Sequence, residues 1–274
     1  MKVVLFCGGL GMRMREYSEV MPKPMVPVGN RPILWHLMKY YASFGHKEFV
    51  LCLGYRSEYV KDFFLNYNEC TTNDFVLSQG GRRVEVFNRE IDDWTITFAE
   101  TGLHANLGQR LTAVRKYLHG EEVFLANYSD GLCDLDLNAY VRMARAKRAV
   151  ATFLSVRSPH SFHTVCATAD GYVEDLRSGD TSQVWINGGF FVFRKEIFDV
   201  IEDGEELVEA PFRRLISRRQ LLTQHHQGFW KCMDTYKDKV FLDQMFERGE
   251  RPWEIWKAEP APVPAPDLRP VEAV

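Results

Sequence analysis

The sequence predicts an α/β fold built on a doubly wound, mainly parallel sheet, and two observations indicate it. Two unbroken apolar runs, at residues 3–6 and 49–54, lead into glycine, which is typical of strands buried on both faces of a parallel sheet. Each run is followed by a segment with apolar residues at helical spacing, at residues 32–44 and 57–66. Strand and helix therefore alternate along the chain, and we expect right-handed crossovers between the strands.

The remaining elements continue this alternation and then become richer in strand. In the first half we expect further strands at 84–86, 94–98, 122–128 and 149–156, and helices at 107–117 and 137–147. In the second half we expect strands at 164–169, 172–175 and 184–193, and helices at 209–219 and 237–248. Prolines crowd the chain from residue 259 onward, and we expect residues 258–274 to form a disordered tail.

Composition narrows the functional class. With 274 residues, 46% of them hydrophobic, the chain is long enough to bury one large core. A formal net charge of −3 argues against a strongly basic protein that binds nucleic acid. No run of about 18 apolar residues occurs, and the apolar start at residues 3–6 is too short for the core of a signal peptide. We therefore expect a cytoplasmic protein without membrane contact.

The six cysteines give no sign of a metal site or a disulfide framework. None of them belongs to a CxxC pair, and none stands at metal-ligand spacing from a histidine in the sequence. We therefore expect all six to be free thiols in a reducing cytosol.

A glycine loop follows the first predicted strand and indicates an anion-binding site. Gly8, Gly9 and Gly11 would let backbone N–H groups approach an anion without obstruction by a β-carbon. Their spacing matches neither the dinucleotide pattern GxGxxG nor the Walker pattern GxxxxGK[ST]. Arg13 and Lys23 follow and could bring fixed positive charge to a triphosphate. The alternative is an ordinary turn followed by a surface arginine.

Two acids stand at the ends of apolar stretches. Asp130 follows a predicted central strand, and the carboxyl edge of an open α/β sheet is where ligands bind. One carboxylate there suits Mg²⁺, which keeps several waters and bridges to phosphates. Asp234 precedes Thr235, which could cap the next helix. For both acids, a structural role in a turn or a helix cap is the alternative.

A predicted strand is interrupted by Asn187, Gly188 and Gly189. Glycines weaken the interior of a strand, so the interruption needs a physical reason. Either the strand bulges at this point or its backbone approaches a ligand closely.

In this order, these motifs resemble those of the sugar-1-phosphate nucleotidyltransferase family, most closely its glucose-1-phosphate cytidylyltransferases. The resemblance runs from residue 1 to about residue 256, so that only the proline-rich tail lies outside it. It is carried by PKPMV at 22–26, RPILWH at 31–36, TG at 101–102, GQRL at 108–111, WINGGFF at 185–191, GFW at 228–230 and MDT at 233–235.

The resemblance implies a Rossmann-like, mixed but mainly parallel sheet flanked by helices, with smaller β-rich elaborations. The domain would span residues 1–257, with a nucleotide half at about 1–135 and an acceptor half at about 136–257. The implied enzyme joins a nucleotide from an NTP to a sugar 1-phosphate with Mg²⁺ and releases pyrophosphate. Residues 101–110 are similar to the cytidylyl version of the loop, which favours CTP over UTP or dTTP. The family also forms oligomers, so we expect a homo-oligomer.

The resemblance also assigns roles to individual residues. The residues expected to be catalytic are Arg13 and Lys23, which would hold the phosphates. Those expected to surround the nucleotide are Gly8, Gly9, Gly11, Met12, Thr101, Gly102 and Arg110. Those expected to bind the acceptor are Asn187, Gly188, Arg177 and His163. The metal would be held by Asp130 and Asp234.

Several positions depart from the family pattern. Met12 stands where the family commonly has threonine, and Ser129 and Gln109 each replace a glycine. The largest departure is at residues 176–180, where LRSGD replaces a Glu-Lys-Pro motif that contacts the sugar and its phosphate. An enzyme site built to hydrogen-bond a substrate group strongly rejects substrates that lack that group. Because the residues that contact the sugar and its phosphate are replaced here, we hypothesise that the acceptor differs from glucose 1-phosphate. Residues 160–163 would then line the altered pocket, unless they have simply drifted in a loop.

Two interpretations therefore stand beside a cytidylyltransferase that acts on a sugar 1-phosphate. The protein could transfer a nucleotide to another phosphorylated acceptor, or it could be a non-catalytic nucleotide-binding regulator. The retained Arg13, Lys23, Asp130 and Asp234 argue against the regulator, because a sensor needs neither a leaving-group arginine nor both metal acids.

Overall fold

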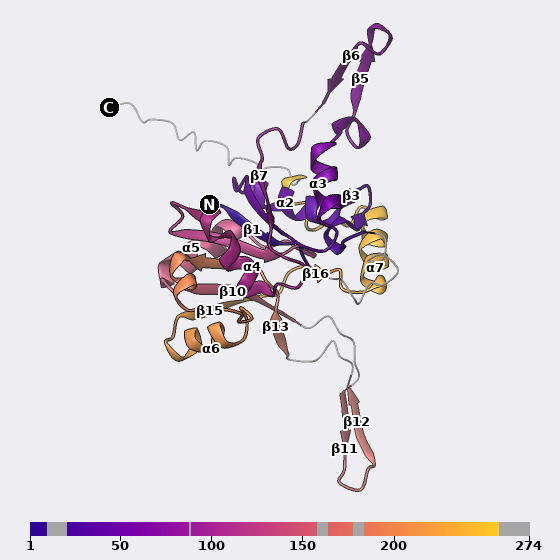
Figure 1. The fold of residues 1–274 in the computed structure, drawn as a ribbon. Helices are drawn as coiled ribbons and strands as arrows, with labels where there is room; N and C mark the ends of the chain where they lie inside the picture. Colours follow the sequence, from indigo (N-terminus) through magenta and orange to yellow (C-terminus); the bar gives the residue numbers. More distant parts are fainter. Residues whose placement is uncertain (10–20, 88, 158–163, 178–183, 258–274) are drawn as a thin grey trace, which may run out of the picture.

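The computed structural model describes residues 1–9, 21–87, 89–157, 164–177 and 184–257 (Figure 1). Its centre is an eight-stranded sheet in which the strand order is β7-β4-β1-β8-β14-β10 and in which β10 also pairs with β13 and β15. These strands are β1 (Val3–Phe6), β4 (Glu48–Leu53), β7 (Thr95–Glu100), β8 (Val123–Tyr128), β10 (Ala151–Arg157), β13 (Trp185–Asn187), β14 (Phe191–Arg194) and β15 (Leu221–His226).

The sheet is mixed but mainly parallel, which confirms the predicted fold class. β1 runs parallel to both β4 and β8, β4 to β7, and β10 to β15. Only β13 and β14 run antiparallel to their neighbours.

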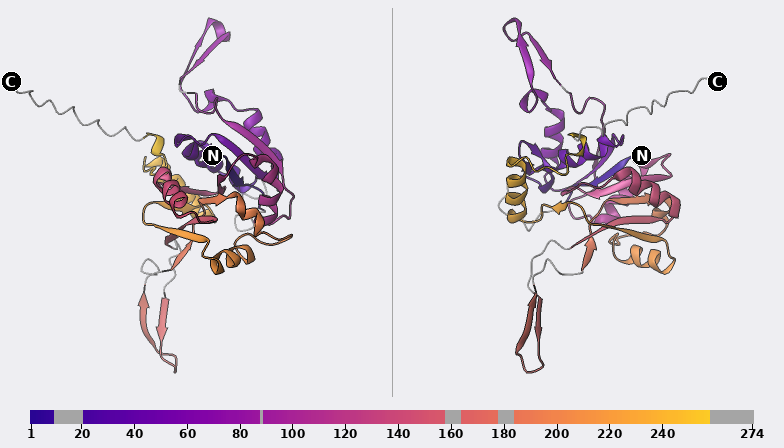
Figure 2. Two further views of the ribbon diagram at one scale, coloured as in Figure 1. Left: turned by 90° about the vertical axis from the view of Figure 1, so that its left-hand side faces the viewer. Right: turned by 180° about the vertical axis from the view of Figure 1, so that it is seen from behind.

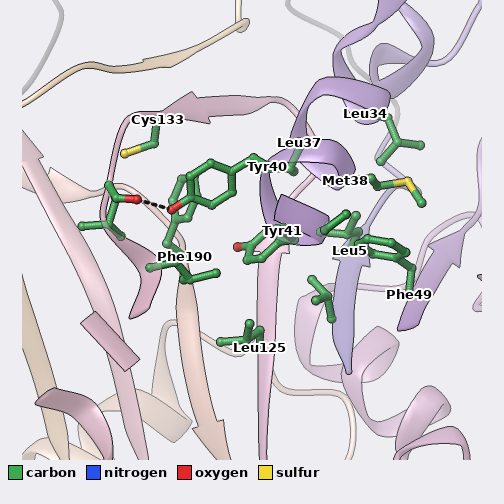
Figure 3. Packing of buried hydrophobic residues seen from close by; sticks show 14 of the residues in the cluster. Leu5, Leu34, Leu37, Met38, Tyr40, Tyr41, Phe49, Leu125, Cys133 and Phe190 are labelled. Atoms are coloured by element: carbon green, nitrogen blue, oxygen red, sulfur yellow. Dashed lines mark hydrogen bonds between the residues drawn. The ribbon is translucent and has the colours of Figure 1, made fainter. Parts of the chain in front are cut away.

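Alternate residues of the central strands face two different cores. Val3 and Leu5 pack in one core with α2 (Ile33–Ser43) and α5 (Leu137–Lys147), and Figure 3 shows Tyr40 and Tyr41 of α2 there. Val4 and Phe6 pack in the other core with α4 (Leu107–Val114) and α6 (Ala210–Ser217). Helices therefore cover both faces, which explains why these strands are unbroken apolar runs in the sequence.

A third core supports a small two-stranded sheet beside the main one. This sheet pairs β9 (Gly131–Cys133) with β16 (Trp230–Cys232) in antiparallel fashion. Leu132 and Met233 pack against Leu242 of α7 (Tyr236–Glu247). The segments that follow β8 and β16 are thereby held side by side.

The other elements are short. Within the described ranges, the remaining α-helix is α3 (Ser57–Leu65), and the 3-10 helices are η2 (Lys23–Met25), η3 (Glu69–Thr71), η4 (Gln79–Gly81), η5 (Arg115–Leu118), η7 (Lys195–Asp199) and η8 (Ile255–Lys257). Three more antiparallel pairs join β2 (Pro27–Val28) to β3 (Arg31–Pro32), β5 (Phe75–Ser78) to β6 (Arg83–Val86), and β11 (Thr164–Ala167) to β12 (Val173–Arg177). The hairpins β5–β6 and β11–β12 project from the body of the molecule in Figures 1 and 2.

Two predicted elements needed correction. The strand expected at 184–193 is two strands, β13 and β14, because the backbone turns at residues 188–190. The helix expected at 107–117 is α-helical only as far as Val114 and then continues as the 3-10 helix η5. Among the described helices, none has the length and apolar character needed to cross a membrane. The predicted tail, residues 258–274, lies outside the described residues.

Candidate active site

A cavity of about 810 Å³ opens at the carboxyl ends of β1 and β8. Its wall is contributed by segments that follow β1, β7 and β8, joined by residues of β13 and β16. The described lining residues are 6–9, 23–24, 103–107, 110, 127–131, 186–188, 206, 230, 232 and 234. The cavity therefore opens at the carboxyl edge of the sheet, the edge at which open α/β folds bind ligands, and Asp130 lies on its wall.

The glycine loop is held in place by a buried arginine. Arg110, on α4, donates from Nη2 to the carbonyl oxygen of Gly8 at 3.0 Å and to that of Leu103 at 3.3 Å. Its Nη1 donates to the carbonyl oxygen of Leu53 at 3.1 Å and to Oγ1 of Thr101 at 2.7 Å. One side chain thus ties together the segments after β1, β4 and β7.

This contact explains why position 8 is glycine. A β-carbon at Gly8 would lie 2.0 Å from Nη1 of Arg110, whereas a β-carbon at Gly9 would meet nothing within 4 Å. Gly8 therefore lets the arginine approach, while Gly9 presents its backbone to open space. Both line the cavity, in keeping with the predicted anion-binding loop.

Arg110 itself was expected to contact the nucleotide, and the structure gives it a further role. All of its described hydrogen bonds go to neutral oxygens, and no described carboxylate forms an ion pair with it. Burial lowers the pKa of its guanidinium, but an arginine remains charged in proteins. Its positive charge is thus fixed behind the glycine loop, where it favours an anion in the cavity.

Thr101 and Gly102, also expected near the nucleotide, lie behind this wall. The Thr101 hydroxyl donates to the carbonyl oxygen of Leu53 at 2.7 Å, and Gly102 adopts a φ of 97°. Neither is among the described residues that line the cavity. Both shape the segment that leads to residues 103–107, which do line it.

Lys23 and the two predicted metal ligands meet at the other side of the cavity. Pairing of β9 with β16 continues as a hydrogen bond of 2.9 Å from the Met233 N–H to the Asp130 carbonyl oxygen. This pairing brings the two aspartates together although they are far apart in sequence. Nζ of Lys23 lies 2.5 Å from Oδ1 of Asp234 and also contacts Oδ2 of Asp130.

The electrostatics of this cluster keep Lys23 charged. Burial is the largest single influence and would lower the pKa of Lys23, but the ion pairs with Asp130 and Asp234 together outweigh it and raise that pKa. The two carboxylates share one cation at half-buried positions. Two converging carboxylates are hard oxygen ligands of the kind that Mg²⁺ prefers, so these residues fit such an ion.

The Asn-Gly-Gly interruption forms a tight turn beside the cavity. Gly189 has a φ of 78°, and a β-carbon there would lie 2.3 Å from Oδ1 of Asn127. The same oxygen accepts from the Phe190 N–H at 2.9 Å, and Asn187 donates to the Tyr128 hydroxyl at 3.2 Å. The break is thus a packed turn, and it also places Asn187 and Gly188 on the cavity wall.

Sequence reasoning missed several lining residues, and Glu206 is the most informative of them. Its Oε2 accepts from the Leu107 N–H at 3.2 Å, and its Oε1 is buried and has no hydrogen-bond partner in the part of the chain that the structure describes. Trp230 was also missed, and it donates from Nε1 to the carbonyl oxygen of Gly188 at 2.9 Å. Glu206 stands in an acidic stretch typical of solvent-exposed loops, so no local pattern could have identified it.

Four predicted site residues lie outside the described residues: Gly11, Met12, Arg13 and His163. Arg177 ends β12, where its backbone pairs with Thr164, and its predicted contact with the acceptor stays a prediction.

Comparison with known proteins identifies the family. The family described as "Nucleotidyl transferase" matches residues 2–237. Glucose-1-phosphate cytidylyltransferase of Salmonella typhimurium is 37% identical over 261 residues, which cover 94% of this chain and 100% of that protein. A probable glucose-1-phosphate cytidylyltransferase of Bacillus subtilis is 36% identical over 258 residues, which cover 93% of this chain and 100% of that protein.

Solved structures share the fold at lower sequence identity. UDP-glucose pyrophosphorylase in complex with UDP-glucose superposes with a TM-score of 0.66 at 12% identity, over 90% of this chain and 98% of that one. HddC from Yersinia pseudotuberculosis gives a TM-score of 0.64 at 19% identity, over 89% of this chain and 99% of that one. The predicted Rossmann-like architecture is thereby confirmed.

Proposed function

The chain belongs to the nucleotidyl transferase family and is an enzyme, and we propose that it transfers CMP from CTP to a sugar 1-phosphate with release of pyrophosphate. The observation that carries the proposal is the convergence of Lys23, Asp130 and Asp234 beside a glycine loop at the carboxyl edge of the sheet. The cytidylyltransferases that match nearly the whole chain support the same reaction.

The reaction needs charge neutralisation more than covalent help from the protein. An oxygen of the sugar phosphate attacks the α-phosphorus of CTP in line, and pyrophosphate leaves. Lys23 stays protonated and offers a fixed positive charge to the phosphates. Arg110 holds the glycine loop so that backbone N–H groups can meet the triphosphate. Arg13 would neutralise the departing pyrophosphate.

A divalent ion fits the same site. Asp130 and Asp234 would hold Mg²⁺, which, when bound, neutralises charge on the α-phosphate and on the leaving group. Until it binds, the Lys23 ammonium occupies the position between the two carboxylates.

Glu206 favours cytosine as the base. β7 and β8 lie on opposite sides of β1, so Asp130, which follows β8, and residues 103–107, which follow β7, lie on opposite sides of the glycine loop. A nucleotide that lies across this loop with its phosphates at Asp130 would place its base near residues 103–107 and Glu206. The 4-amino group of cytosine is a hydrogen-bond donor, whereas uracil and thymine present an acceptor at that position. Glu206 lines the cavity there, and a carboxylate suits the donor and repels the acceptor.

The assay that tests the proposal measures pyrophosphate release from CTP, UTP and dTTP in competition, with Mg²⁺ and glucose 1-phosphate present. We expect release that requires the acceptor and prefers CTP. The same assay with a panel of phosphorylated acceptors tests the second candidate function, transfer to another acceptor, which the departure at residues 176–180 favours. Binding of MgCTP without release in the presence of any acceptor would favour a non-catalytic regulator.

We also propose that the enzyme works as a cytoplasmic homo-oligomer, as the family resemblance implies. The projecting hairpin β5–β6 supports this, since Phe75, Val76, Leu77 and Val84 on it are exposed apolar side chains. Light scattering of the purified chain should give a mass that is a multiple of 31.8 kDa. A mass of a single chain at micromolar concentration would contradict the proposal.

A further inference from the structure

A second cluster of ligand-type atoms lies behind the cavity wall, at the far end of the β9–β16 pair. Cys133 ends β9, Asp134 follows it, and His226 ends β15. The thiol sulfur, one carboxylate oxygen and one imidazole nitrogen of these residues lie within 4.8 Å of one another. We propose that this cluster, completed by the Phe229 carbonyl oxygen, binds a thiolate-seeking divalent metal ion such as Zn²⁺.

Hydrogen bonding alone does not account for the arrangement. Nε2 of His226 lies 2.9 Å from Oδ1 of Asp134, 3.2 Å from the Phe229 carbonyl oxygen and 3.4 Å from Sγ of Cys133. A single ring N–H cannot serve two acceptor oxygens and a sulfur equally well. Among the described residues, none forms a hydrogen bond with the buried Oδ1 of Asp134, although this oxygen lies close to the ring nitrogen.

The distances that start at the ring nitrogen of His226 are close to the separations between ligand atoms in a zinc site. Zinc binds nitrogen and oxygen at about 2.0–2.2 Å and sulfur at about 2.3 Å, which separates its ligand atoms by roughly 3.3–3.7 Å. The distance of 3.4 Å from Nε2 of His226 to the sulfur already lies in that range, and the distances of 2.9 and 3.2 Å to the two oxygens need only a small expansion to reach it. One sulfur, one nitrogen and two oxygens form a donor set that zinc accepts.

The surroundings favour a buried ion with an entry path. Cys133 is buried in the core around α2, whereas the Asp134 side chain is 32% exposed and offers a route for the ion. Gly228 leaves the necessary room, because a β-carbon there would lie 2.4 Å from Oδ1 of Asp134 and 2.8 Å from Cε1 of His226. Burial raises the pKa of the Cys133 thiol, so the ion would displace a proton, which leaves to solvent.

The inferred site is structural and separate from the metal acids of the cavity. None of its four residues is among the described residues that line the cavity. It joins the end of β9 to the end of β15 and to the residue that precedes β16. A bound ion would therefore brace the small sheet whose opposite end carries Asp130 and Asp234.

The test titrates chelator-treated full-length protein with Co²⁺ and Zn²⁺ while excess Mg²⁺ occupies hard oxygen sites. We expect one Co²⁺ per chain with a thiolate-to-metal charge-transfer band in the near ultraviolet. Cys133→Ser and His226→Gln should remove the band and weaken binding roughly 100-fold or more. Zn²⁺ should raise the Tm of the unmodified chain and leave that of Cys133→Ser unchanged.

Matched cysteine variants separate this site from other thiols. Cys232 lies beside Asp234 in the cavity, and Cys166 is exposed, so Cys232→Ser and Cys166→Ser should both keep the band. Asp134→Asn provides the same test if Cys133→Ser does not fold. A band that survives in Cys133→Ser, or that disappears in Cys232→Ser, overturns the inference. Neither outcome bears on the nucleotidyl transfer assay.

Discussion

Lys23 and Arg110 border the same cavity but are held in opposite ways. Lys23 contacts two carboxylates, Asp130 and Asp234, whereas Arg110 donates to three backbone carbonyl oxygens and one hydroxyl. A metal ion can replace an ammonium between carboxylates, but it cannot replace the fork of donors that ties three loops together. The Lys23 side is therefore suited to rearrange when substrate binds, and the Arg110 side is suited to stay fixed.

Asp130→Asn should have the largest effect and act only on the Lys23 side. Loss of this proposed metal ligand should lower kcat/KM for CTP by roughly 10²–10³-fold, the size typical of removing one electrostatic contact to the transition state. The free energy of unfolding should change little, because the amide can still accept from Lys23. Steady-state pyrophosphate release and urea unfolding measure the two quantities, with Asp92→Asn on the surface as control. A decrease in kcat/KM of less than threefold would show that Asp130 is not a metal ligand.

Chemical labelling of Cys232 should show how well the part of the cavity around Lys23, Asp130 and Asp234 protects a thiol from reaction. Burial raises the pKa of Cys232 to about 12, so the side chain remains a neutral thiol near pH 8. Because the thiolate is the reactive form, Cys232 should react with iodoacetamide roughly 100-fold more slowly than an exposed cysteine. Peptide mass spectrometry against the exposed Cys166 supplies the comparison. Equal rates at the two positions would contradict a closed, protonated environment.

Gly8→Ala should damage the Arg110 side by displacing the guanidinium. The added methyl group would meet Arg110, and overpacking of this kind lowers the free energy of unfolding by about 2 kcal/mol. Gly9→Ala is the matched control, because its β-carbon would enter open space and should change stability by less than about 0.5 kcal/mol. If Gly9→Ala nevertheless raises the KM for CTP, the nucleotide lies against Gly9. Equal destabilisation by both variants would contradict the fixed position of Arg110.

Glu206→Gln should have the smallest effect and alter selectivity rather than rate. Loss of the carboxylate should reduce the preference for CTP over UTP by roughly tenfold, in line with about 1–3 kcal/mol for a base contact. Glu205→Gln serves as control, because Glu205 pairs with Arg214 and does not line the described cavity. The ratio of kcat/KM values for the two nucleotides is the readout. An unchanged ratio would show that the base is recognised elsewhere.

Part of each side of the cavity could be predicted from the sequence, because strand ends have local patterns. Asp130 and Gly8 each follow an apolar run, and a parallel sheet places both at one edge. Glu206 could not be predicted, because its position depends on packing against α4, 99 residues earlier in the chain. The family motif identified Arg110, but it could not show that backbone carbonyl oxygens occupy its donors.

The cysteines illustrate the same limit. The sequence predicted no metal site at a cysteine, because no cysteine stands at ligand spacing from a histidine. Cys133 and His226 are 93 residues apart and meet only because β9 and β15 end at the same place. Spacing rules detect sites built on one loop or helix, and they miss those assembled between distant strands.

The short β9–β16 pair has a consequence for how the enzyme matures during synthesis. Lys23, Asp130 and Asp234 meet only when a segment near the start of the chain, one at its middle and one close to its end are all present. A growing chain can form the glycine loop early, yet it lacks the second acid until β16 has been made and paired with β9. A ribosome-bound chain that stops before residue 230 would therefore fold much of its core and still be unable to assemble the acidic pair.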